Sequence, residues 1–449
     1  MSYFGQIALH ILIGILIYLN EGLAKIYFFV ILGYFLYRIT LSSHDNSKTY
    51  EVLKACAYFV GAEVFLRTAR GAISYEAVKY IVMLFMLIGM LYKGLSGKGY
   101  PYFIYIMLLV PSIFVASTTL SFDANFRTNI AFVLSGPICL GIAALFCYDK
   151  RVTFGQMSNI LYLMVLPIVS HVVYIFFYNP SVKEVISTVA SNRTASGGWG
   201  ANQVSAVLGL GMLIMVIRLF TSSPSNRLKL VNALILVAMS YRALVTFSRG
   251  GVITALITIV VFLFFYYIRS SEKKRNEILG VFIFICVSFS ITWMVSVNQT
   301  SGLINLRYEN KDSLGREKSD FTTGRGELFK KELDGFIGNP FLGIGSSRAK
   351  DQRIEEEGQG VTSHSEVSRT LAEHGIFGVL ILLILIFKPL SVRYYNRENY
   401  YFYPFLFFWF LTINHMSMRL AMPAFIYALA LLRVVNDPVI IHRKQIAPR

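Results

Sequence analysis

One polar stretch, SHSEVSRTLAEHGIFG (residues 363–378), stands in an otherwise apolar chain and contains a histidine suited to acid–base chemistry. Ser363 followed three residues later by Glu366 predicts a capping box, and Gly375 predicts the end of the helix. His364 then falls in the first helical turn, where the positive end of the helix dipole disfavours an imidazolium. A neutral ring can accept a proton, so His364 is the candidate general base. The alternative is a solvated loop histidine.

Two arginines are placed to bind an anion. Arg325, in FTTGRGELFKKELDG, is predicted at a helix start, where a planar guanidinium beside free backbone N–H groups favours phosphate. Arg249, in TFSRGG, lies between two apolar runs at the predicted outer membrane boundary, and ionisable residues at that depth are functional candidates. The competing interpretations are an ion pair of Arg325 with Glu327 or Asp320, and snorkelling of Arg249 to the lipid headgroups.

Five more polar side chains are possible substrate contacts. Arg242 lies two helical turns deeper than the TFSRGG arginine on the same face, so we expect it to line the same cavity or pair with a buried acid. His415 and Arg419, in INHMSMRLAMP, fall at the predicted outer end of a span and either contact phosphates or cap a loop. Asn202 and Gln203 follow SGGWGA, face outward, and are placed to bind sugar hydroxyls. No DxD motif or histidine cluster demands a metal ion.

The elements that must position these side chains are transmembrane helices. Of 449 residues 55% are hydrophobic and 15% charged, which is not a soluble profile. Apolar runs of roughly 16 to 22 residues recur, long enough to cross a hydrocarbon core of about 30 Å. The predicted fold is an all-α polytopic membrane protein with about 12–14 transmembrane helices. The candidate spans are residues 4–20, 25–40, 52–67, 76–93, 101–118, 128–147, 156–178, 202–221, 229–247, 251–268, 277–297, 376–391, 399–416 and 420–435.

The weakest candidate is 52–67, because Lys54, Glu63 and Arg67 also fit an interfacial helix.

One long segment without a span divides the chain into three parts. We expect a helix bundle in residues 1–297, a large loop with short helices in 298–375, and closing helices with a tail in 376–449. With alternating spans, the loops placed inside hold 21 Lys and Arg residues against eight in the short outside loops. The positive-inside rule therefore predicts cytoplasmic termini and a large loop outside the cytoplasm. The net charge of +17 then reflects membrane topology, not nucleic-acid binding.

Three motifs follow one another in a fixed order. Arg249 stands in SRGG, Arg325 stands in a GR pair before an NPFLGIG turn, and HSEVSRTLAEHGIFG begins at His364. This order, and the match of the last motif to H-[NSQ]-x9-G-x-x-[GTY], resembles the bacterial O-antigen ligase and O-antigen polymerase superfamily. The resemblance covers roughly residues 200–380, with Phe329 where many members have Trp.

The resemblance implies a GT-C-like, metal-independent glycosyltransferase that needs no cofactor. Such an enzyme moves a glycan from undecaprenyl pyrophosphate to an acceptor hydroxyl, on the periplasmic side of the bacterial inner membrane. Arg249 and Arg325 would hold the pyrophosphate, and His364 would accept the proton of the attacking hydroxyl. The partners would be the lipid-linked donor, a lipid or glycan acceptor, and the bilayer. We favour O-antigen ligase, with lipid A core as acceptor, over O-antigen or polysaccharide polymerase and then protein O-oligosaccharyltransferase.

A transporter or lipid flippase is the alternative from another class. Such proteins often have repeated halves, with charged or broken spans at matching depths. This chain shows no internal repeat, and its candidate residues fall on one predicted side of the membrane. These features favour an enzyme with an outward-facing site.

Overall fold

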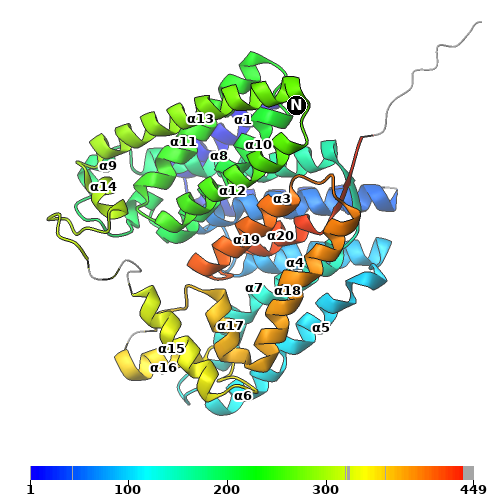
Figure 1. The fold of residues 1–449 in the computed structure, drawn as a ribbon, viewed down its shortest axis with the longest axis vertical. Coiled ribbons are helices and arrows are strands. Elements are labelled where there is room, and N and C mark those ends of the chain that lie inside the picture. The colour runs from blue at the N-terminus through cyan, green and yellow to red at the C-terminus, as the bar shows by residue number, and fades with distance from the viewer. Residues whose placement is uncertain (1, 43, 319, 321–323, 359, 438–449) are drawn as a thin grey trace, which may run out of the picture.

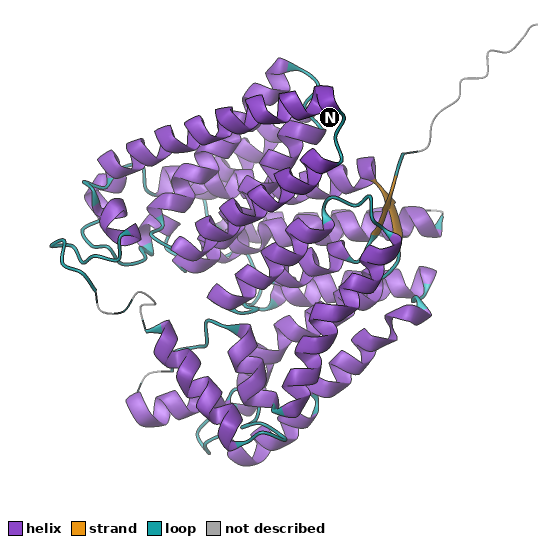
Figure 2. Cartoon of the chain, in the orientation of Figure 1, coloured by secondary structure: helices purple, strands orange, loops and turns teal. Residues whose placement is uncertain are grey.

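The protein is almost entirely helical (Figures 1 and 2). The computed structural model describes residues 2–42, 44–318, 320, 324–358 and 360–437. Within these ranges, nine helical segments are long and apolar enough to cross a membrane, which confirms the all-α polytopic fold. They are α2 (Gly22–Leu41), η1–α5–α6 (Gly97–Gly99, Tyr100–Leu109 and Pro111–Thr119), α7 (Phe126–Cys147), α8 (Phe154–Tyr178), α10 (Ala201–Thr221), α11 (Asn226–Val245), α12 (Arg249–Ile268), α13 (Glu272–Gln299) and α18 (Ile376–Tyr395).

The remaining predicted spans also coincide with helices, but these are shorter or less apolar. They are α1 (Tyr3–Leu19), α3 (Asp45–Thr68), α4 (Ala77–Lys93), α19 (Phe402–Met416) and α20 (Ala421–Ala430). The short connecting helices are α9 (Val182–Val185), η2 (Thr194–Ser196), α14 (Leu303–Tyr308), α15 (Arg325–Gly338), α16 (Arg348–Glu357) and α17 (Glu366–His374).

Local sequence starts several of the long helices. At α8, Thr153 and Gln156 form a reciprocal capping box, in which the Gln156 N–H donates to Thr153 Oγ1 at 3.1 Å and the Thr153 N–H donates to Gln156 Oε1 at 2.9 Å. Asn125 and Ser225 cap α7 and α11 with single side-chain oxygens. These caps satisfy backbone donors that a helix start leaves unpaired.

The helix α3 lies in the middle of the bundle, not at an interface, packed against α8, α4 and α2. Its charges are neutralised internally. Arg67 Nη2 lies 2.6 Å from Glu63 Oε1, with both side chains almost completely buried. The Ala421 N–H donates to Glu63 Oε2 at 2.7 Å and joins α3 to α20. Because a buried charge is costly unless it is paired, the polar residues of 52–67 mark a central position.

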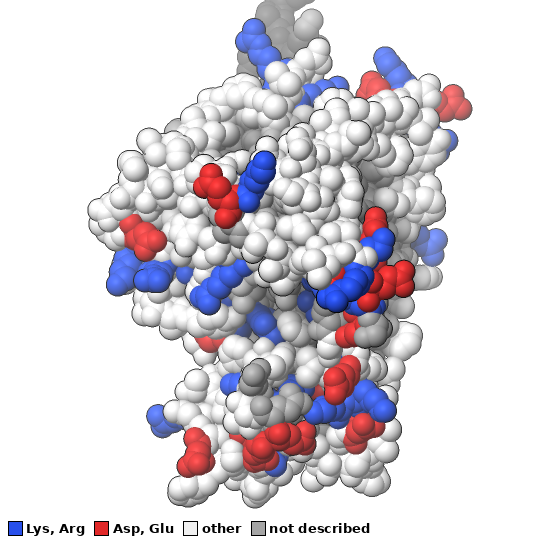
Figure 3. Space-filling model, turned by 90° about the vertical axis from the view of Figure 1, so that its left-hand side faces the viewer, with Lys and Arg blue, Asp and Glu red and all other residues white. Residues whose placement is uncertain are grey.

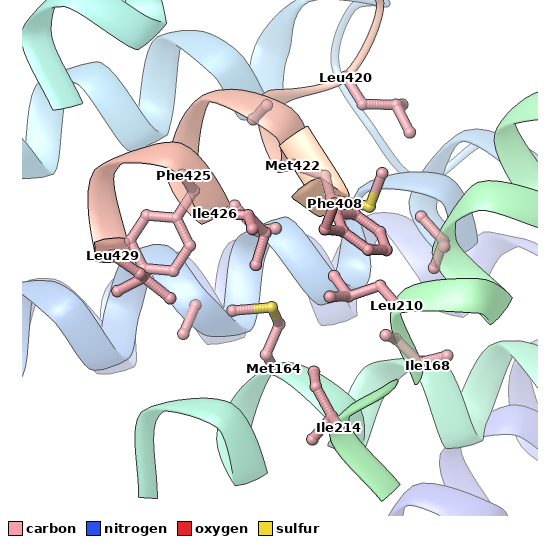
Figure 4. Close-up of a cluster of buried hydrophobic side chains, with 14 of the residues drawn as sticks. Met164, Ile168, Leu210, Ile214, Phe408, Leu420, Met422, Phe425, Ile426 and Leu429 are labelled. Atoms are coloured by element: carbon pink, nitrogen blue, oxygen red, sulfur yellow. The ribbon is translucent and has the colours of Figure 1, made fainter. Parts of the chain in front are cut away.

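The core lies where α8, α10, α19 and α20 meet (Figure 4). Met164 of α8, Leu210 of α10, and Phe408 of α19 are completely buried there, as are Phe425 and Ile426 of α20. The helix α20 is buried around its whole circumference, although it has only 10 residues. Burial of this kind stabilises a helix that is marginal by its length alone.

The segment between α13 and α18 folds into short helices. In Figure 1, α15, α16 and α17 lie together beside α6, whereas α14 lies next to the end of α13. The Ser346 N–H donates to the Ser112 carbonyl at 3.1 Å, and Ser121 Oγ donates to Asp351 Oδ1 at 2.7 Å. These bonds fasten the segment to both ends of α6.

The two ends of the bundle differ. At one end, β1 (Arg151–Thr153) and β2 (Arg433–Val435) pair in parallel, near the start of α1 (Figure 1). The opposite end collects the last residues of α3, α11 and α13 with the loop between α19 and α20, as the contacts described below show. The candidate residues lie at this second end.

Candidate functional site

Four arginines and two histidines lie close enough to interact electrostatically. In Figure 3, basic side chains are seen in the narrow region between the larger and smaller parts of the molecule. Arg249 and Arg325 are close enough to interact electrostatically with Arg307. Arg325 and Arg419 interact in the same way with His364 and with His415. Six chain segments supply them: Arg249 begins α12, Arg307 lies in α14, Arg325 begins α15, His364 precedes α17, His415 ends α19, and Arg419 follows it. We call Arg249, Arg307, Arg325 and Arg419 the arginine cluster.

The glycines after Arg249 bring α12 close to its neighbours. A Cβ at Gly250 would lie 2.4 Å from Cδ2 of His415, and one at Gly251 would lie 2.4 Å from the Ser205 carbonyl carbon. The Ser205 hydroxyl donates to the Ser248 carbonyl at 2.9 Å. The SRGG motif therefore places Arg249 where α10, α12 and α19 make their closest approach.

Arg307 is the member of the arginine cluster that the sequence motifs do not reveal. It is 7% exposed, its Nε donates to the Phe247 carbonyl at 3.1 Å, and its own carbonyl accepts from Arg249 Nη1 at 3.3 Å. Burial lowers the pKa of Arg307 to about 10, and the charges of Arg249 and Arg325 add to this effect. An arginine in INLRYEN, directly after a predicted span, is too common a pattern to single it out.

Arg325 occupies the helix start that the sequence predicts. Gly324 is the N-cap of α15 with φ of 79°, and its N–H donates to the Asp320 carboxylate. Thr323, which the sequence pattern also places at this start, lies outside the described residues. Within the described part of the chain, neither Asp320 nor Glu327 forms an ion pair with Arg325. Burial lowers the pKa of Arg325, and Arg249 lowers it further.

The predicted capping box at Ser363 is wrong, whereas Gly375 does end the helix as predicted. Ser365 is the N-cap of α17, and its Oγ accepts the Ser368 N–H at 3.4 Å. The Ser363 hydroxyl instead donates to Glu332 Oε2 at 3.1 Å. His364 therefore precedes the helix and does not lie in its first turn.

The ring of His364 is neutral because of burial and nearby arginines, and not because of the helix dipole on which the sequence prediction relied. Burial lowers the pKa of His364 to about 3, and the charges of Arg419 and Arg325 lower it further. A hydrogen bond with the His415 backbone opposes this shift. The Nδ1 atom is buried and has no hydrogen-bond partner among the described residues. The ring is thus neutral and able to accept a proton.

Glu332 joins the segments that carry Arg325 and His364. It lies two turns into α15 and is 2% exposed. Its carboxylate accepts from the Ser363 hydroxyl at 3.1 Å, from the Ser368 hydroxyl at 2.5 Å, and from both terminal nitrogens of Arg353 at 3.2 and 3.3 Å. One carboxylate therefore ties α15, α16 and the start of α17 together.

The NPFLGIG turn serves packing. Gly343 and Gly345 have φ values of 72° and 96°, and a Cβ at Gly343 would lie 2.5 Å from the Glu373 backbone. The Ile344 N–H donates to the Ala372 carbonyl at 2.9 Å. The turn wraps around the end of α17 and so holds the segment that follows His364.

His415 and Arg419 both reach the site, in different ways. His415 is buried against Gly250, its Nδ1 bonds the Leu411 carbonyl at 3.1 Å, and its Nε2 has no partner among the described residues. Arg419 Nη2 donates to the Ser363 carbonyl at 2.8 Å and to the Thr362 side chain and carbonyl. The contacts of Arg419 fit the loop-capping alternative and also place its charge beside His364.

Two other expected contacts take structural partners. Arg242 does not line the site: it stacks on Phe176, 4.0 Å from the ring centroid, and donates to the Asn179 carbonyl at 2.8 Å. It pairs with no buried acid among the described residues. Gln203 was expected to face outward and bind sugar hydroxyls. It is instead buried, and its Oε1 accepts from Arg67 Nη1 at 3.0 Å.

Asn202 is partly exposed and its Oδ1 accepts from Ser248 at 2.7 Å.

Within the described ranges, no group of three or more His, Cys, Asp or Glu side chains is placed to hold a metal ion, and the metal-free mechanism stays an expectation.

Comparison with protein-family models matches residues 234–383 to a family described as O-antigen ligase. The matched region contains Arg249, Arg307, Arg325 and His364, but it ends before His415 and Arg419. Comparison with curated proteins finds no relative of the chain.

Proposed function

We propose, from the match of residues 234–383 to the O-antigen ligase family, that this membrane protein is a glycosyltransferase with a pyrophosphate-linked glycan donor. The observation that carries the proposal is the convergence of Arg249, Arg307 and Arg325. Like charges held together lower one another's affinity for a proton and cost folding free energy. A bound ligand with several negative charges offsets this repulsion, and pyrophosphate is such a ligand.

The shape of the guanidinium group supports this role. Each presents a planar fork of donors that matches phosphate oxygens, and a buried fork loses little entropy when it binds. During transfer, negative charge grows on the departing pyrophosphate. Arg249 and Arg325 would stabilise that charge through hydrogen bonds to the phosphate oxygens.

His364 would remove the proton from the acceptor. Its ring is neutral, and it lies within electrostatic range of Arg325. The acceptor hydroxyl would give its proton to the imidazole as its oxygen attacks the sugar carbon that carries the pyrophosphate. Bound pyrophosphate would weaken the effect of Arg325 and Arg419 on the ring, so that the base becomes stronger when the donor is present.

An apolar cavity of about 290 Å³ supports a lipid-linked donor. It lies between α10, α11, α12 and α13, and its walls include Leu256, Val260, Ile285 and Phe289. Arg249 begins α12 two turns before Leu256, and Arg307 lies in α14, just after the C-terminal end of α13. A polyprenyl tail in this cavity would lead its phosphates toward the arginine cluster.

The topology expected from sequence fits this enzyme. The arginine cluster would lie on the periplasmic side of a bacterial inner membrane, with both termini in the cytoplasm. The end with β1 and β2 carries Lys150, Arg151 and Arg433, as the positive-inside rule requires of a cytoplasmic end. The glycan donor would then be undecaprenyl pyrophosphate, and the favoured acceptor is lipid A core. Polymerase activity uses the same donor chemistry with a glycan as acceptor.

An in vitro transfer assay tests the proposal. Purified protein is given an undecaprenyl-pyrophosphate-linked glycan with lipid A core, free glycan and peptide acceptors in parallel, with and without EDTA. We expect transfer to lipid A core, unaffected by EDTA. His364→Ala should lower the rate by about 10²–10⁴-fold, because it removes the general base.

The control is His44→Ala, since His44 is exposed at the start of α3 and makes no side-chain capping bond. The mechanism would be refuted if the protein transferred glycan to none of the three acceptors, or if His364→Ala kept full activity.

A further inference from the structure

A second cavity opens beside the arginine cluster, with a volume of about 330 Å³. Its walls come from the loop before α10, the first turn of α10, and Arg419. Sites that hold small ligands typically have volumes of about 300–1,000 Å³. We infer that this cavity is a glycan subsite for a sugar ring with an anionic substituent, an inference that rests on the proposed glycosyltransferase function.

An oriented indole forms one wall. Trp199 Nε1 donates to Gln203 Oε1 at 3.1 Å, and the Gln203 amide in turn donates to the Tyr75 hydroxyl at 2.9 Å. Arg67, itself paired with Glu63, donates to the same Gln203 oxygen at 3.0 Å. This network fixes the indole plane. An amphipathic ring of this kind offers an apolar face to the C–H groups of a sugar.

The positive charge of the cavity favours an anionic substituent on the sugar. Arg193 and Arg419 both line it, and no Asp or Glu does among the described residues. Arg193 is held by one bond, from Nε to the Gly198 carbonyl at 2.8 Å, and Arg419 by bonds from Nη2 alone. The other guanidinium nitrogens of both arginines make no hydrogen bond to the described residues. Two forks without a carboxylate partner favour a carboxylate on the ligand.

The cavity is also connected to the reacting groups. Arg419 acts electrostatically on His364, so a sugar bound against Arg419 lies next to the proposed base. Asn202 lines the cavity, and its Oδ1 accepts from the hydroxyl of Ser248, the residue before Arg249. The Asn202 amide N–H₂ remains a donor for a sugar hydroxyl. The subsite would therefore bind the sugar nearest to the bond that forms or breaks.

Binding of small glycosides tests the inference without any transfer reaction. Full-length protein in detergent is titrated with methyl β-D-glucuronide and with methyl β-D-glucoside, and tryptophan fluorescence is followed. We expect a saturable change with the glucuronide, at least about tenfold tighter than with the glucoside, because hydrogen bonds between charged groups are stronger than those to a neutral hydroxyl. Trp199→Phe should abolish the fluorescence change.

A negative charge introduced into the cavity gives the sharper result. Asn202→Asp keeps an oxygen that accepts from Ser248, loses the amide donor and adds a negative charge. Glucuronide binding should therefore weaken at least about tenfold, and glucoside binding, which meets no charge repulsion, should weaken much less. Arg127→Gln, which removes an exposed positive charge at the start of α7, is the matched control and should leave both affinities unchanged.

Equal affinity for the two glycosides, or an Asn202→Asp protein that still prefers the glucuronide, would overturn the inference. If the protein binds the glucuronide selectively but transfers no glycan, the proposed function fails and the subsite remains. If it transfers glycan but does not discriminate between the glycosides, only the subsite is refuted.

Discussion

The acid limb of the pH–rate profile depends on the surroundings of His364. Burial and the charges of Arg419 and Arg325 hold its pKa at about 3. An unperturbed imidazole of pKa about 6.5 is about 90% neutral at pH 7.5 but only about 25% neutral at pH 6. A base of that kind would lose about fourfold in rate over this interval. With the lowered pKa the ring stays neutral throughout, so kcat/KM should be constant between about pH 6 and 7.5.

The sign of the change on donor binding follows from charge. Because kcat/KM reports the free enzyme, its acid limb should lie well below about pH 5. Bound pyrophosphate brings negative charge next to Arg325 and Arg419 and so reduces their effect on the ring. The pKa of His364 should therefore rise in the complex, and the acid limb of kcat should lie at higher pH than that of kcat/KM.

The assay measures initial transfer rates from about pH 3 to pH 8 at low and saturating donor, with samples returned to pH 7.5 as a control for irreversible unfolding. An approximately fourfold fall in kcat/KM between about pH 7.5 and pH 6, fitted by one proton, would refute the account of His364. A kcat limb at lower pH than the kcat/KM limb would contradict anion binding beside Arg325.

Three further predictions concern the parts that hold the site. Arg249→Lys keeps the charge but loses the planar fork, so kcat/KM for transfer should fall about 10–100-fold, and wild-type turnover would favour snorkelling instead. Glu332→Gln should lower stability by about 3 kcal/mol in a thermal melt, because Arg353 stays buried without its partner, and it should also lower kcat. The matched control is Glu327→Gln, since Glu327 is exposed. Equal kcat and equal melting temperature in the two variants would contradict the role of Glu332. Gly250→Ala forces a Cβ against the His415 ring and should lower both melting temperature and activity, whereas Gly280→Ala, with no atom within 4 Å, should not.

Much of this protein is determined by local sequence. The long apolar runs predict its helices because a bilayer leaves backbone groups no partner except one another. The three motifs predict Arg249, Arg325 and His364 as candidates, and the helix start at Arg325 lies where its local sequence predicts, whereas the one near His364 does not. Gly375 ends a helix and Gly324 precedes one, as their sequence context predicts, and the structure adds that both have positive φ.

Tertiary structure alone decided which side chains meet. Arg307 joins the arginine cluster because α14 packs near the start of α12, while Arg242 faces Phe176, and no local pattern distinguishes the two. Ser363 and Ser365 are both acceptable caps, and the distant Glu332 recruits the first and leaves the second to α17. The low pKa of His364 likewise comes from burial and from arginines on other segments. Such effects depend on distances between remote residues, which hydropathy and motif spacing do not encode.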